Sequence, residues 1–293
     1  MSAELAKAKT RRRVFFDARN LFFLGLAIAF VCALQHPDLF GKRLFNTDGG
    51  SEFMRFVREA AHPTLVSEDD ATISLTADIV DAVKKTVAVA FAAIGLAIVL
   101  GLFWGLLASE AFWDRDPVVP LSRAARFWRG TLRTGIRAVV RTAMALLRSV
   151  HELVWALLFT SLFSVNLYCG IAALAVPFAA SYGRICAEIL DETPRDSARA
   201  LRALGGGDTS IFFFGLLPRA LPGMLSYTFY RFDCAVRSSA VLGFVGYPTL
   251  GLLIRSSFSD LNYREVWTYL YVLFAILALT DVASDAVRRR LAR

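Results

Sequence analysis

The chain has 293 residues, of which 56% are hydrophobic and only 20% charged, and its mean hydropathy is +0.50. An average globular protein carries about 25% charged residues, so this composition excludes an ordinary soluble protein and also excludes intrinsic disorder. Apolar runs long enough to cross a bilayer recur along the chain. We therefore predict an all-α polytopic membrane protein, a helical bundle of about six transmembrane helices.

Six segments are predicted to cross the membrane, because each approaches the roughly 17–25 mostly apolar residues that one span needs. The clearest is Thr86–Ala108, whose 23 residues include no charged side chain. The first span, Asn20–Leu34, follows a basic segment as in a signal peptide, but it lacks a clean cleavage site, so we expect an uncleaved anchor. The other four spans are placed at about 149–165, 168–187, Leu221–Gly246 and Val266–Ala283.

The distribution of lysine and arginine sets the orientation, since cytoplasmic loops carry an excess of both residues. Residues 1–20 hold six Lys/Arg and residues 109–149 hold eight, whereas residues 35–85 hold six against nine acids. Both termini are therefore predicted to be cytoplasmic. We divide the chain into residues 1–85, a cytoplasmic tail with the first span and an external segment, and residues 86–293, which contain the other five spans.

An arginine stripe precedes the third span. Its members recur every three or four residues, so they share one face of a helix: Arg123, Arg126, Arg129, Arg133, Arg137 and Arg141, with Arg148 one heptad later. Such a stripe is typical of a voltage-sensor helix or of a helix lying on anionic lipid headgroups. Six arginines at the bilayer centre would cost roughly 15–20 kcal/mol, which favours the interfacial helix.

The loop at residues 188–222, between the fourth and fifth spans, is highly charged, with five acids and four arginines. Its pattern of charges, prolines and glycines predicts a helix, a glycine turn and a second apolar element. In chain order these are an N-cap at Thr193 before Pro194, a helix over residues 195–204, a stop at Gly205–Gly207, and a short element running from Ile211 to Pro218.

This loop resembles the cytoplasmic coupling loop of ABC importer permeases. Their EAA motif reads Glu-Ala-Ala, three residues, Gly, nine residues, Ile, one residue and Leu-Pro. The positions that match are Ala200, Gly205, Leu217 and Pro218. The positions that depart are Arg199 for Glu, Leu201 for Ala and Gly215 for Ile. The resemblance implies that Arg199 and its neighbours in the motif couple the chain to an ATPase subunit, with a reversed charge at the contact.

Two further segments narrow the resemblance to phosphonate ABC transporter permeases. Arg148–Phe159 reads RSVHELVWALLF and Leu225–Gly246 reads LSYTFYRFDCAVRSSAVLGFVG. The usual patterns are RxIPELVWAL and SYTLYRFExNVRxxxVLGxVG, so His151 replaces a proline and Asp233 a glutamate. The resemblance covers about residues 85–290. It implies that residues 86–293 form the permease domain and that the chain imports phosphonate-like phosphorus oxyanions.

The resemblance also implies the partners of the chain. No GxxxxGK[ST] sequence is present, so we expect this chain to bind no cofactor and to be no enzyme, with ATP and Mg held by a separate ATPase dimer. A second permease chain, identical or a sister subunit, and a solute-binding protein outside the membrane complete the expected assembly. We expect the protein in the bacterial inner membrane, in contact with lipid and not with nucleic acid.

Ionisable residues deep within a span are candidates for the transport path. Arg231, Asp233 and Arg237 fall in the fifth span, and Glu152 begins the third. Asp233 and Arg237 are spaced i, i+4, so they either form an ion pair that fixes the helix or line the path. Arg231 projects from nearly the opposite face and either meets an anion, packs against a sister chain or snorkels to the membrane surface. Glu152 either caps the end of its helix, pairs with Arg148 or lines the path.

Two other functions stay open at this point. The same permease fold would also serve methionine or another small anion. A voltage-gated or passive channel built on the arginine stripe is the alternative from another class, and it would need no ATP. No nucleophile and base pair or metal-ligand cluster points to an enzyme.

Overall fold

The computed structural model describes residues 18–34, 47–68, 74–113 and 123–291. These described residues form helices, together with one isolated bridge between Val66 and Ser74, so the all-α prediction is confirmed. The chain divides into two units, Met1–His62 and Pro63–Arg293.

The first unit contains two described helices, α2 (Ala18–Leu34) and α4 (Thr47–Glu59). Helix α2 coincides with the predicted first span, and α4 carries exposed Phe53 and Met54 on a strongly amphipathic helix. The unit ends at His62, and Thr64 just after it bonds to Thr268 of the last helix of the second unit. The predicted functional division at residue 85 stays a prediction.

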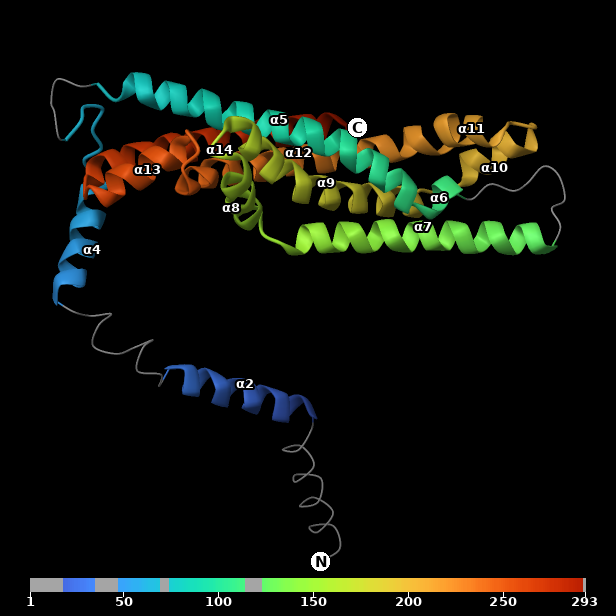
Figure 1. The fold of residues 1–293 in the computed structure, drawn as a ribbon, viewed down its shortest axis with the longest axis horizontal. Helices are drawn as coiled ribbons and strands as arrows, with labels where there is room; N and C mark the ends of the chain where they lie inside the picture. The colour runs from blue at the N-terminus through green and yellow to red at the C-terminus, as the bar shows by residue number, and fades with distance from the viewer. Residues whose placement is uncertain (1–17, 35–46, 69–73, 114–122, 292–293) are drawn as a thin grey trace, which may run out of the picture. The chain divides into compact units, whose positions relative to one another are not determined.

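The second unit is a bundle of long helices joined by short ones (Figure 1). Its helices in chain order are α5 (Thr76–Ala108), α6 (Glu110–Trp113), α7 (Arg123–Ser149), α8 (Glu152–Phe163), α9 (Leu167–Glu192), α10 (Asp196–Ala203), α11 (Asp208–Ser210), a π-helix η1 (Ile211–Leu216), α12 (Leu217–Val241), a 3-10 turn η2 (Leu242–Val245), α13 (Leu250–Ser259) and α14 (Tyr263–Leu291).

Helices α5 and α9 form the most extensive contact of the bundle, and small residues make it possible. A Cβ atom added at Gly101 would lie 2.8 Å from the carbonyl oxygen of Ala179, and one at Gly105 would lie 2.8 Å from that of Gly183. A Cβ atom at Gly183 would in turn lie 2.7 Å from the Gly101 oxygen. The two backbones therefore touch directly, with no side chain between them at these positions.

All six segments that we predicted to span the membrane are helical. Within the described part of the chain, α5, α9 and α14 are each long and apolar enough to cross a bilayer. Two bent pairs, α7 with α8 and α12 with α13, add up to two further spans, and residues 20–33 form a shorter apolar helix.

The third predicted span, about 149–165, is corrected by the structure. A helix ends at Ser149 inside this segment, and α8 begins at Glu152 at an angle of 86° to α7. With 12 residues, α8 is only about 18 Å long and cannot cross a bilayer alone. The two helices pass the length and composition test for a span only when they are taken together, as either one broken span or a re-entrant loop.

The direct α5–α9 contact predicts a contrast between two glycines of the same helix. Gly101→Ala places a methyl group against backbone and the Tyr182 ring, so we expect a loss of about 1–3 kcal/mol in stability. Gly95→Ala is the matched control, because no atom lies within 4 Å of its added Cβ. Thermal unfolding of the purified protein in detergent checks this, and equal melting temperatures for the two variants would contradict the contact.

Candidate functional site

The helix predicted for the loop at residues 188–222 is α10. We call it the coupling helix after the role that the resemblance implies, and that role stays a prediction. The helix begins at Asp196, two residues after Pro194. The predicted N-cap role of Thr193 is wrong, because its hydroxyl donates to the Ile189 carbonyl at 2.6 Å and so belongs to the end of α9. Pro194 follows that end, where a proline commonly stops a helix.

Gly205 ends the coupling helix as predicted. Its φ of +80° lies in the left-handed region, which favours glycine. The N–H of Gly206 donates to the Leu201 carbonyl at 3.0 Å, the bond that defines a Schellman-type helix end. A Cβ atom at Gly205 would meet no atom within 4 Å, so the requirement for glycine here comes from the backbone conformation alone.

The coupling helix is seated on the π-helix η1 through Gly215. A Cβ atom at Gly215 would lie 3.1 Å from Leu201 Cδ1 and 3.2 Å from Ala198 Cα. Two departures from the EAA motif therefore compensate each other, because the larger Leu201 fills the space that the missing side chain of Gly215 leaves. None of the residues of α10 is fully buried, so this seat supplies the packing that eight residues cannot provide for themselves.

The opposite face of the coupling helix is open. The Arg199 side chain is 78% exposed and lies 3.5 Å from Asp196, and Ala200 is also exposed. Leu204, which the sequence analysis did not single out, is 85% exposed at the end of the helix. The predicted coupling residues thus divide into an outward pair, Arg199 and Ala200, and an inward residue, Leu201.

The second element of the loop does not stop at Pro218, contrary to our prediction. The π-helix Ile211–Leu216 continues without a break into α12, where Pro218 occupies the first turn. Proline is tolerated there because N–H groups of a first turn have no partner within the helix. Leu217 and Pro218 therefore join the loop to the fifth span. Arg219 reinforces this junction by donating to Ser197 Oγ at 3.0 Å.

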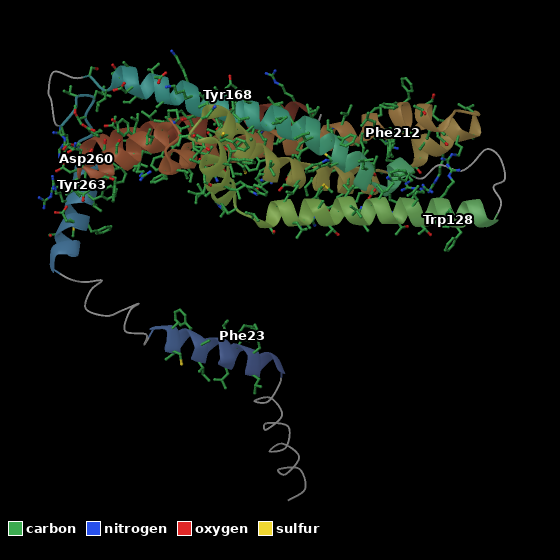
Figure 2. The ribbon with its side chains drawn as sticks, in the orientation of Figure 1. Phe23, Trp128, Tyr168, Phe212, Asp260 and Tyr263 are labelled. Atoms are coloured by element: carbon green, nitrogen blue, oxygen red, sulfur yellow. The ribbon has the colours of Figure 1, made fainter. Side chains whose placement is uncertain are left out.

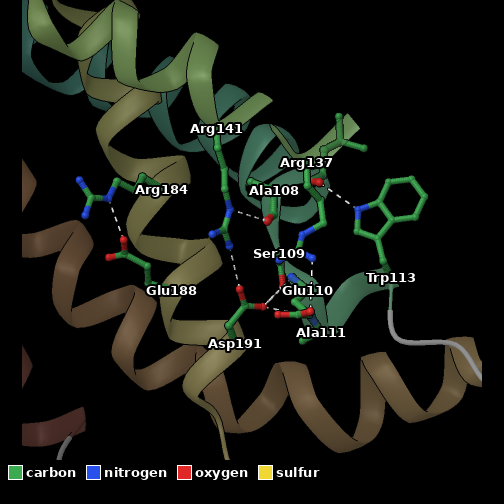
Figure 3. A network of polar contacts seen from close by, with 11 residues as sticks. Ala108, Ser109, Glu110, Ala111, Trp113, Arg137, Arg141, Arg184, Glu188 and Asp191 are labelled. Atoms are coloured by element: carbon green, nitrogen blue, oxygen red, sulfur yellow. Dashed lines mark hydrogen bonds and ion pairs between the residues drawn. The ribbon is translucent and has the colours of Figure 1, made fainter. Parts of the chain in front are cut away.

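Asp191 ties three helices together just before the coupling helix (Figure 3). Its Oδ1 accepts bonds from Ser109 Oγ and from the N–H groups of Glu110 and Ala111, at 2.7, 2.7 and 3.0 Å. Its Oδ2 accepts a bond from Arg141 Nη2 of α7 at 3.0 Å. This one carboxylate, at the end of α9, thus links α9 to three other helices. It binds the end of α5, the start of α6, and α7. Sequence analysis missed this residue, since an acid at the end of a span has no local pattern.

The arginine stripe forms a helix as predicted, and part of its charged face is turned toward protein. Arg141 also donates to the Ala108 carbonyl, and Arg137 pairs with Glu110 at 3.3 Å. Residues on the other side of α7 are apolar and exposed, and Figure 2 shows Trp128 projecting from that side. The side chains of Arg123 and Arg126 lie outside the described residues. Contact with lipid headgroups stays a prediction.

A basic cavity of about 400 Å³ lies where α7 breaks into α8, against α9 and α12. Its charged and hydroxyl-bearing lining residues, with the histidine, are Arg148, Ser149, His151, Glu152, Ser181, Arg231, Arg237 and Ser238. The His151 ring caps α8 by accepting from the Leu153 N–H at 3.2 Å. The structure therefore brings three of the four predicted path residues to one cavity and adds Arg148, His151 and three serines to them.

Arg231 is held in this cavity by aromatic rings. Its guanidinium carbon lies 4.8 Å from the centre of the Phe178 ring and 5.9 Å from that of Tyr227, which are cation–π distances. Its Nε atom is buried and makes no hydrogen bond within the described chain. A guanidinium whose buried nitrogen has no hydrogen bond and which lines a cavity is an attractive partner for an anion.

The other path candidates are partnered. Asp233 lies 3.1 Å from Arg237, so the predicted i, i+4 ion pair is confirmed, and Asp233 also accepts from the Thr280 hydroxyl. Asp233 does not line the basic cavity, whereas Arg237 does. Glu152 accepts from Ser238 at 2.7 Å, and its described contacts include no ion pair with Arg148.

The fold of this chain is similar to that of two solved membrane transporters. The MetNI methionine ABC transporter in an inward-facing conformation contains a chain that is 24% identical, with a TM-score of 0.60, and the match covers 78% of this chain and 100% of that one. An amino acid ABC transporter solved with histidines gives a TM-score of 0.58 at 18% identity, covering 73% and 94% of the two chains. The fold is therefore that of an ABC importer permease.

Residues 121–293 match the family described as binding-protein-dependent transport system inner membrane component, and the chain belongs to this family. The phosphate-import permease protein PhnE of Mycolicibacterium smegmatis is 28% identical over 218 residues, which are 74% of this chain and 38% of that protein. The phosphite transport system permease protein PtxC of Stutzerimonas stutzeri is 28% identical over 151 residues, 52% of this chain and 55% of that protein. The matched regions thus span about half or less of these relatives.

The Asp191 contacts predict a large effect from one carboxylate. Asp191→Ala leaves three donors and the Arg141 guanidinium without their shared acceptor, so we expect a loss of about 2–3 kcal/mol in stability. Glu188→Ala is the control, because it removes only the exposed pair with Arg184 one turn earlier, worth about 0.5 kcal/mol or less. Melting curves in detergent measure both, and a similar small effect for Asp191→Ala would refute its linking role.

Proposed function

We propose that the chain is the transmembrane permease subunit of an ATP-driven importer for phosphonate-like phosphorus oxyanions. The observation that carries the proposal is the basic cavity at the break between α7 and α8. The phosphate and phosphite named for the relatives belong to the same chemical class.

The charge of the basic cavity suits an oxyanion. Three arginines and one carboxylate line it, which gives a net charge of about +2 with the histidine neutral. Asp233 behind Arg237 reduces this by one. The cavity also lies at the N-terminus of α8, and broken helices in transporters present such N-termini to anionic groups of the solute.

The coupling loop would transmit ATP hydrolysis to this cavity. In our proposal the outward face of α10, with Arg199, Ala200 and Leu204, docks on an ATPase subunit that holds ATP and Mg. The η1–α12 connection carries the movement of α10 into the fifth span without a flexible joint. Arg199 would meet an acidic residue of the ATPase, since it has the opposite charge to the usual glutamate.

The complete transporter would contain two permease chains, an ATPase dimer and a solute-binding protein on the outer side. Alternating access then consists of rocking of the two helical bundles as the ATPases close and open. The proposal places the protein in the bacterial inner membrane with both termini and the coupling loop cytoplasmic.

The alternatives fit the described contacts less well. Methionine is zwitterionic and needs no cavity with an excess of arginine, so a phosphorus oxyanion suits the charges better. A voltage sensor needs arginines that move relative to the bundle, whereas Arg141 is bonded to α9 and to the end of α5. A comparison of ATPase stimulation by phosphonate, phosphite, phosphate and methionine in the assembled transporter separates the solutes.

The coupling role predicts that Gly205→Val impairs transport. A branched side chain at φ +80° costs about 1–2 kcal/mol or more, so we expect uptake to fall about tenfold while ATP hydrolysis continues. Gly207→Val is the matched control in the same loop, since Gly207 has φ −71° and equally open surroundings. Uptake and ATP hydrolysis by reconstituted transporter are measured together, and normal coupled uptake with Gly205→Val would count against the docking role.

The solute site predicts a change in affinity on neutralising Arg231. Loss of one charge-assisted hydrogen bond weakens binding by about 10- to 100-fold, so Arg231→Gln should raise the half-saturating solute concentration by that factor. Arg184→Gln also removes one positive charge, but from α9 outside the basic cavity. It should leave the half-saturating solute concentration unchanged. The measurement is solute-dependent uptake by reconstituted transporter, and unaltered kinetics with Arg231→Gln would remove this residue from the path.

A further inference from the structure

A second basic cavity lies beside the coupling loop, far along α7 from the first. It has a volume of about 280 Å³ and is lined by α6, α7 and the residue that precedes the coupling helix. We call it the α6–α7 cavity. Its charged and polar lining residues are Glu110, Trp113, Arg133, Thr134, Arg137 and Arg195.

Arginines outnumber carboxylates in the lining of the α6–α7 cavity. Three arginines and one carboxylate line it, and Arg195 has a further interaction of its own. One guanidinium nitrogen of Arg137 forms an ion pair with Glu110 at 3.3 Å. The buried Nε of the same side chain makes no hydrogen bond in the described chain. Arg133 is half-buried and forms no ion pair with any described residue.

The walls of the cavity are fixed in place. The Trp113 indole N–H donates to the Leu107 carbonyl at 2.9 Å, which holds the ring at the end of α6. Asp191 anchors the start of α6, and Arg137 is only 22% exposed. Arg133 and Arg137 of α7, Thr134 of the same helix and Arg195 before the coupling helix all line this cavity, and guanidinium and hydroxyl groups are the donors that a tetrahedral oxyanion needs.

We propose that the α6–α7 cavity binds a phosphate group, either that of free inorganic phosphate or that of an anionic lipid headgroup. Both sources offer the same tetrahedral oxyanion to Arg133 and Arg137. The proposal stands on the cavity alone and does not depend on which solute the protein transports.

A bound phosphate group would connect two moving parts. Arg133 and Arg137 belong to α7, whose other end carries Arg148 of the basic cavity, and Arg195 directly precedes the coupling helix. An anion shared between them would hold α7 against the coupling loop. The site would thus bias the movement on which coupling depends.

The test measures binding of radiolabelled inorganic phosphate to the full-length chain, purified in dodecyl maltoside, by equilibrium dialysis. Arg133→Gln should weaken phosphate binding at this site at least about tenfold. Arg129→Gln is the matched control, because Arg129 is an exposed arginine one turn earlier on the same helix that does not line the cavity. Arg133→Lys keeps the charge and should retain part of the affinity, which separates lost binding from misfolding.

Two further arms identify the source of the phosphate group. The same titration is repeated in nanodiscs of phosphatidylcholine and of phosphatidylglycerol, and co-purified phosphatidylglycerol is counted. If the site serves free phosphate, the titration is equal in both discs and sensitive to Arg133→Gln. If it serves a headgroup, phosphatidylglycerol suppresses the titration and Arg133→Gln reduces the lipid retained.

Equal phosphate binding and equal lipid retention for Arg133→Gln and Arg129→Gln would overturn the proposal. A wild-type protein that neither binds phosphate nor retains phosphatidylglycerol would also overturn it. Arg231→Gln is measured alongside, since it alters the first basic cavity and leaves the α6–α7 cavity intact. Failure of the solute site and failure of this second site are therefore distinguishable.

Discussion

The seat of α10 on the π-helix is the contact on which the proposed coupling depends. An eight-residue helix without a fully buried residue has little stability of its own. It is held because Gly215 presents no side chain, Leu201 fills the space above it, and Gly205 turns the chain back in a left-handed conformation. Since η1 runs straight into α12, a force on the exposed face of α10 acts on a transmembrane helix and not on a loose loop.

Helix α7 connects the region around the coupling helix to the rest of the second unit. At one end it carries Arg148, at the broken junction that forms the basic cavity. Near its middle, Arg141 reaches Asp191, the carboxylate that also binds the end of α5 and precedes the coupling helix by a few residues. A stripe of arginines that would be costly in lipid is thus partly neutralised by acids and carbonyls at the ends of neighbouring helices. The α5–α9 glycine contact supplies the rigid frame against which these elements are placed.

Local features were predictable from the sequence, and long-range ones were not. The apolar segments, the helix stop at Gly205 and the Asp233–Arg237 pair follow from spacing along one chain segment, and all are present. Thr193 was assigned to the wrong helix because both neighbouring helices end near it. Asp191 and the Leu201–Gly215 compensation depend on contacts between elements, which no local pattern reveals. The break between α7 and α8 lies where the sequence analysis separated the interfacial arginine helix from the third span, whereas the angle of 86° could not be predicted from the sequence.

In the proposed transporter, the outward face of the coupling helix lies on the inner side of the membrane and contacts an ATPase. The most direct measurement is labelling of Leu204→Cys, in a background with the four natural cysteines replaced by alanine, by a membrane-impermeant maleimide. Leu204 is 85% exposed, so the thiol is accessible whichever side it occupies. We expect labelling in inside-out vesicles alone, with protection when the ATPase is bound. Labelling in right-side-out vesicles would contradict it.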